Sequence, residues 1–78
     1  MDIKILGTGC AKCQRLEAVT RTAVDQLGID ASVDHVTDPA DIASWGVMAT
    51  PALVVDDEVV AVGKVPTQAE VVALLTAR

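Results

Sequence analysis

Short apolar runs alternate with longer amphipathic segments along the chain. Residues 3–6 form a β-branched apolar run that stops at Gly7, which predicts a buried strand. Between residues 16 and 27, apolar positions recur at spacings of three and four. This spacing predicts a helix of about four turns that ends at Gly28, where a C-terminal glycine cap belongs. Residues 31–36 are less apolar and predict a second strand, at the edge of the sheet.

The second half of the chain begins with a helix signal. Asp38 is a favourable N-cap residue, and Pro39 suits the first helical position, so we expect a short helix that stops near Gly46. Residues 53–55 and 59–62 are apolar runs on either side of three acidic residues. Two such runs around a short polar segment predict a β-hairpin.

A last helix follows the hairpin. Thr67 and Glu70 have the spacing of a capping box, and Val71, Leu74 and Leu75 provide an apolar face. The predicted order is therefore β-α-β-α-β-β-α. The first two strands, joined through a helix, are expected to be parallel, and the last two to form an antiparallel hairpin. We expect an α/β fold in which three helices cover a four-stranded mixed sheet, with residues 1–78 forming one domain.

Composition and charge exclude several functions. The chain has 78 residues, a formal net charge of −5 and one aromatic residue, Trp45. Nucleic-acid binding requires basic surface and commonly uses stacking aromatics, and anionic membranes attract basic surface, so neither partner is expected. The N-terminus carries no recognisable signal peptide, and no stretch approaches the ~20 apolar residues of a transmembrane helix. We therefore expect a cytoplasmic protein, and a monomer.

The candidate chemistry is the pair Cys10 and Cys13, between the first strand and the first helix. A disulfide across so short a loop removes little entropy from the unfolded chain, so it would be a poor structural staple. A helix N-terminus, with its unpaired N–H groups and positive dipole end, instead favours a thiolate, and Lys12 adds a nearby cation. We expect Cys10 to be the exposed attacking thiolate. Cys13, one turn into the helix, is expected to be buried and to resolve the mixed disulfide.

The C-x-x-C spacing alone leaves redox and metal-binding interpretations equally open, because structural zinc sites use the same pair. A closed zinc site needs four ligands, whereas the chain offers two cysteines and His35. Copper or zinc carriers with C-x-x-C after the first strand have the order β-α-β-β-α-β, which the helix predicted from Asp38 contradicts. A binding or sensor module that uses the disulfide as a switch stays open as a further alternative.

Two motifs carry a family resemblance. They are residues 7–13, GTGCAKC, and residues 45–53, WGVMATPAL. With Gly63 after the hairpin, the sequence resembles over nearly its whole length the minimal, glutaredoxin-sized thioredoxin-like proteins of bacteria and archaea. It departs from common thioredoxins in having Gly9 before the first cysteine and Ala11-Lys12 between the two. It also lacks the tyrosine on which part of the glutathione site of glutaredoxins depends.

The resemblance implies a thioredoxin-like fold and a protein disulfide reductase that works by dithiol–disulfide exchange in electron transport and cell redox homeostasis. It implies a redox-active Cys10–Cys13 disulfide, no bound cofactor or metal, disulfide-containing protein substrates, and re-reduction by a flavin reductase that uses NADPH. It further implies a cis peptide bond before Pro51 in a loop that faces the cysteines, with the backbone of Thr50 pairing with the substrate. The remaining expected substrate contacts are Gly9, Ala11, Lys12, Pro51 and Gly63.

Overall fold

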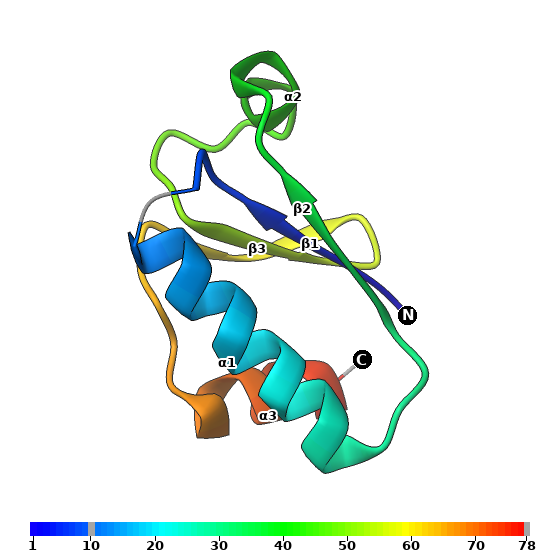
Figure 1. Ribbon diagram of the computed structural model, residues 1–78. Helices are drawn as coiled ribbons and strands as arrows, with labels where there is room; N and C mark the ends of the chain where they lie inside the picture. Colours follow the sequence, from blue (N-terminus) through cyan, green and yellow to red (C-terminus); the bar gives the residue numbers. More distant parts are fainter. Residues whose placement is uncertain (10, 78) are drawn as a thin grey trace.

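The computed structural model describes residues 1–9 and 11–77, in which four strands and three helices follow the predicted order (Figure 1). The elements are β1 (Asp2–Leu6), α1 (Ala11–Leu27), β2 (Ser32–Val36), α2 (Pro39–Ser44), β3 (Ala52–Val55), β4 (Glu58–Val62) and α3 (Gln68–Thr76). None of the described helices is long and apolar enough to cross a membrane.

The strands form one mixed sheet in the order β2-β1-β3-β4. β1 pairs with β2 in parallel and with β3 antiparallel, and β3 pairs antiparallel with β4. The predicted parallel pair, the predicted hairpin and the edge position of β2 are all confirmed. β1 is therefore a central strand, and the chain that leaves its carboxyl end passes directly toward α1 (Figure 1).

The sheet is covered on both faces. α1 and α3 pack together on one face, over a buried layer that includes Ile3, Ile5 and Leu53 (Figure 1). α2 covers part of the other face, where Ile42 packs with Leu6 and Val54. The alternation of side chains along β1 and β3 divides the core in this way, because successive residues of a strand point to opposite faces.

The helix caps that the sequence predicted are present in the structure. The N–H of Gly28, at φ +64°, donates to the Val24 carbonyl at 3.0 Å and closes α1. The Asp38 carboxylate accepts from the Ala40 N–H at 2.8 Å at the start of α2. At the start of α3 the Thr67 hydroxyl and the Glu70 carboxylate form the reciprocal bonds of a capping box.

The hairpin turn is shorter than the sequence predicted. Asp56 and Asp57 alone close it, with φ of 50° and 65°, and Glu58 already belongs to β4. Two consecutive left-handed residues match the right-handed twist of the strands, so the turn needs only two residues. The Asp2 N–H donates to the Asp56 carboxylate at 2.9 Å, which ties this turn to the start of β1.

Candidate functional site

The loop from β1 to α1 brings the second cysteine into the core. Cys13 lies in the first turn of α1 and is fully buried, as predicted. Gly9 has φ +88°, a conformation that favours glycine, and its carbonyl accepts from the Gln14 side chain at 3.3 Å. Cys10 lies outside the described residues, so its exposure and its attacking role stay predictions.

Gly7 makes room for the Cys13 sulfur. A Cβ at Gly7 would lie 2.2 Å from Cys13 Sγ, too close unless the sulfur moves, and 3.1 Å from Cys13 Cβ, a tight contact. Its N–H donates to the Val36 carbonyl at 3.0 Å, so the backbone of residue 7 is fixed against β2. The sequence analysis assigned Gly7 to the end of the first strand. It missed the packing against Cys13, because the packing depends on the angle at which α1 crosses the sheet.

The predicted loop before β3 reaches the same place. The Thr50–Pro51 peptide bond is cis, and Pro51 is buried. A Cβ at Gly7 would lie 4.0 Å from Thr50 Cβ, so Thr50 and Cys13 flank the same glycine. The Gly63 N–H, at φ +74°, donates to the Pro51 carbonyl at 2.8 Å. The structure thus brings Cys13, Thr50, Pro51 and Gly63 to one end of the sheet.

The residues between the cysteines are accessible. Ala11 and Lys12 begin α1 and are both exposed, as substrate contacts would have to be. The described parts of the loop therefore consist of an accessible outer segment and a buried sulfur beneath it. Such an arrangement suits a reaction in which an exposed thiol reacts first with a partner and a buried thiol reacts second.

A groove that the sequence did not predict lies beside this site. It has a volume of about 250 Å³ and runs between α2 and the segment before the cis bond. Its lining residues are Thr8, Pro39, Ile42, Ala43, Val47, Met48, Ala49 and Thr50. Seven of the eight belong to residues 39–50, and the fold brings Thr8, from the loop after β1, beside them.

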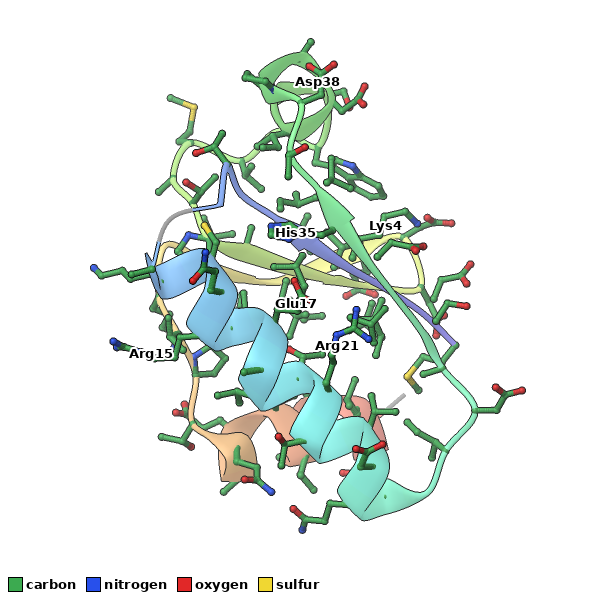
Figure 2. The ribbon with its side chains drawn as sticks, viewed as in Figure 1. Lys4, Arg15, Glu17, Arg21, His35 and Asp38 are labelled. Carbon is green, nitrogen blue, oxygen red and sulfur yellow. The ribbon has the colours of Figure 1, made fainter. Side chains whose placement is uncertain are left out.

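The side of α1 that faces β2 carries a polar network. Glu17 binds His35 Nδ1 at 3.0 Å through Oε1 and Arg21 Nε at 3.0 Å through Oε2 (Figure 2). Arg21 Nη2 also donates to the Val33 carbonyl at 3.4 Å. Within residues 1–9 and 11–77, His35 Nε2 and Thr20 Oγ1 are buried atoms without a hydrogen-bond partner. His35 therefore has a partner at Nδ1 and none at Nε2 among the described residues.

Trp45 has a packing role. It is half-buried and packs with the layer formed by Leu6, Ile42 and Val54, and Lys4 Nζ lies 5.7 Å from the centroid of its ring. Among the residues that the structure describes, no three His, Cys, Asp or Glu side chains are grouped to hold a metal ion.

Comparisons with known proteins agree with this geometry. The family model described as "Thioredoxin domain" matches residues 1–76. A thioredoxin from Methanocaldococcus jannaschii is 45% identical over 69 residues, which cover 88% of this chain and 79% of the relative. A thioredoxin from Methanothermobacter thermautotrophicus is 42% identical over 76 residues, which cover 97% of this chain and 99% of the relative.

Proposed function

The chain belongs to the thioredoxin-domain family, and from this premise we propose that Cys10 and Cys13 are the redox pair of a thiol–disulfide oxidoreductase. The curated relatives are thioredoxins, and the chain covers most of their length, so the reaction class is disulfide reduction by dithiol exchange. The metal-carrier alternative is not favoured by the family, nor by the order of strands and helices.

The proposed reaction has two displacement steps. The Cys10 thiolate attacks one sulfur of a substrate disulfide, forms a mixed disulfide and releases the first substrate thiolate. Cys13 then loses its proton and attacks the Cys10 sulfur, which releases the second substrate thiolate and leaves a Cys10–Cys13 disulfide. The released thiolates take up protons. Two electrons pass from the protein to the substrate, and a second reductant must return them before the next cycle.

One observation carries the assignment of roles. Cys13 Sγ is buried against Gly7, at the position where Thr50 and the cis Thr50–Pro51 bond also meet this glycine. A buried thiol beneath an accessible loop is protected from outside disulfides and suits attack on the other cysteine, three positions earlier in the chain. The exposed backbone segment that precedes Pro51 is the natural place for an extended substrate to pair.

The proposal also names the protein's partners, its substrate contacts and its location. We infer that disulfide-containing proteins are the substrates and that a flavin reductase using NADPH returns the electrons. The expected substrate contacts are Gly9, Ala11, Lys12, Thr50, Pro51 and Gly63, with no resident cofactor beyond the cysteine pair. We place the protein in the cytoplasm as a monomer.

A redox titration with cysteine variants tests the proposal. In a dithiothreitol ladder, alkylation and intact mass should report a reversible two-electron couple with a midpoint of about −200 to −300 mV. Cys13→Ser should accumulate a mixed disulfide with a protein substrate, whereas Cys10→Ser should accumulate none. Thr22→Ala, on the exposed side of α1, is the matched control and should keep the reversible two-electron couple of Cys10 and Cys13. If no intramolecular disulfide forms under oxidising conditions, the exchange mechanism is wrong.

A further inference from the structure

Charged side chains are divided between the two ends of the sheet. β1 and β3 are antiparallel with Leu6 opposite Ala52, so the carboxyl end of β1 and the start of β3 lie together at the end that holds the proposed redox site. The opposite end carries four acidic residues, at the start of β1 and in or directly after the hairpin turn; they are Asp2, Asp56, Asp57 and Glu58. A partner that reaches the redox site therefore approaches from the end away from this acidic group.

Cations outside any salt bridge lie at the redox end. Of the lysines and arginines in residues 1–9 and 11–77, Lys4 and Arg21 form ion pairs with carboxylates, at 3.9 and 3.0 Å. The other three are exposed and form no salt bridge with the described residues; they are Lys12, Arg15 and Lys64, which we call the basic rim.

The basic rim comes from two segments that both reach the proposed redox site. Lys12 lies between the two cysteines, and Arg15 lies one turn later in α1, where it projects outward from the helix (Figure 2). Lys64 directly follows Gly63, whose N–H donates to the Pro51 carbonyl at 2.8 Å. The cations thus stand beside the groups that are expected to contact a substrate.

Cations at the start of α1 do not serve the stability of that helix. The N-terminus of a helix carries a partial positive charge, which favours acidic residues in the first turn. α2 and α3 have Asp41 and Glu70 there, whereas α1 has no acidic residue in its first turn. Lys12 can stabilise a thiolate, but the proposed reaction gives no role to Arg15 or Lys64. Recognition of a negatively charged partner explains all three positions.

Acidic residues near the site limit where such a partner can bind. Asp38 and Asp41 begin α2, beside the segment that leads to the cis bond, so a carboxylate of a partner is disfavoured on that side. Lys64 lies near Glu70, but the Glu70 carboxylate already accepts the Thr67 N–H at 3.0 Å. The favourable side is therefore the one formed by α1 and the segment after β4.

We propose that the basic rim binds carboxylates that flank the disulfide of the protein substrate, so that this acidic protein selects substrates with an acidic surface around their disulfide. The inference rests on the proposed function, since it names the substrates of that same site. Charges at the contact surface act mainly on the rate of association, and salt screens them. The preference should accordingly appear in the second-order rate constant and should weaken as the ionic strength rises.

A series of disulfide peptides tests the inference. The peptides differ only at the positions that flank the disulfide, which carry Glu, Gln or Lys. The second-order rate constant for their reduction by the reduced protein is divided by that for dithiothreitol, an uncharged dithiol, to remove their intrinsic reactivity. At an ionic strength of about 0.01 M the Glu peptide should react about tenfold faster than the Lys peptide, and this ratio should approach one at about 1 M.

Variants of the basic rim assign the effect to its residues. Arg15→Gln and Lys64→Gln should each reduce the ratio between the Glu and Lys peptides at low ionic strength, and Arg15→Lys should keep it. Ser32→Asp is the matched control, because it changes the net charge by the same amount at the acidic end of the sheet, where Ser32 pairs with Asp2. It should retain most of the wild-type ratio.

An uncharged disulfide, 2,2′-dithiodipyridine, separates the two possible failures because it carries no flanking charge. If the wild type reduces this compound, and reduces the Glu and Lys peptides at equal normalised rates at low ionic strength, the inference is overturned and the redox function stands. The same conclusion follows if Arg15→Gln and Lys64→Gln change the ratio no more than Ser32→Asp does. If neither the compound nor any peptide is reduced, the proposed function fails and the inference fails with it.

Discussion

At the scale of single residues, glycines in this chain serve two different physical needs. Gly28 is required by backbone conformation, since its φ is +64° and a Cβ there would meet nothing within 4 Å. Gly7 is required by space, since its Cβ would lie 2.2 Å from Cys13 Sγ. The two cases look alike in the sequence. They predict different consequences, because only the second couples the backbone of β1 to the position of the reactive sulfur.

Gly7→Ala should therefore impair both folding and catalysis. Overpacking of this kind costs about 1–3 kcal/mol, so we expect the free energy of unfolding from urea titration to fall by that amount. Because the added methyl group must displace Cys13 Sγ, release of the second substrate thiol in a single-turnover experiment should slow as well.

Gly28→Ala is the matched control, since it places the same methyl group at the far end of α1. It should lower the free energy of unfolding by about 1–2 kcal/mol through backbone strain and leave the single-turnover rate unchanged. Equal rates for Gly7→Ala and Gly28→Ala would contradict the role assigned to Gly7.

At the scale of helices and strands, local signals predicted most of the structure. Asp38-Pro39, Gly28 and the Thr67–Glu70 pair each mark a terminus through contacts with residues two to four positions away, so the sequence alone contained them. The C-x-x-C spacing of Cys10 and Cys13 also limited the candidate sites to redox and metal-binding ones. The packing of Gly7 against Cys13 was not predictable, and neither was the position of Thr8 beside residues 39–50 in the groove along α2. Both depend on how the tertiary structure brings separate residues together.

The capping box of α3 predicts a pH dependence of stability. The pKa of Glu70 is lowered from 4.5, mainly because its carboxylate accepts the Thr67 backbone N–H, with further contributions from the Thr67 side chain and the charge of Lys64. A lowered pKa in the folded state stabilises the protein above the unfolded-state pKa, and this contribution is lost as the pH falls through the folded-state value.

Glu70→Gln keeps a neutral acceptor for the Thr67 N–H and removes the charge. Its urea midpoint should therefore lie below that of the wild type at neutral pH and near pH 4.5, and the gap should close as the pH falls further. Glu70→Ala, which removes the acceptor as well, should stay below the wild type throughout. A gap for Glu70→Gln that is as wide in strong acid as at neutral pH would show that charge is not the cause.

At the scale of the whole molecule, the two faces of the sheet are covered unequally. The α1 and α3 face holds the larger buried layer, whereas the face under α2 relies on a helix of six residues and a few buried side chains. A chain of 78 residues has a free energy of unfolding of about 4–12 kcal/mol. The thinner layer lies under α2, beside the segment that leads to the cis Thr50–Pro51 bond.

This asymmetry predicts that the α2 layer can loosen separately from the rest. Ile42→Ala removes the buried anchor of α2, and Trp45, the one tryptophan, caps the same helix and reports on it by fluorescence. In this variant the Trp45 transition should occur at lower urea than the loss of far-UV circular dichroism, which follows α1 and α3. Leu16→Ala, in the larger layer, should instead lower the free energy of unfolding by about 2–5 kcal/mol. It should shift the fluorescence and circular-dichroism transitions together. Coincident transitions in Ile42→Ala would mean that the two layers unfold as one unit.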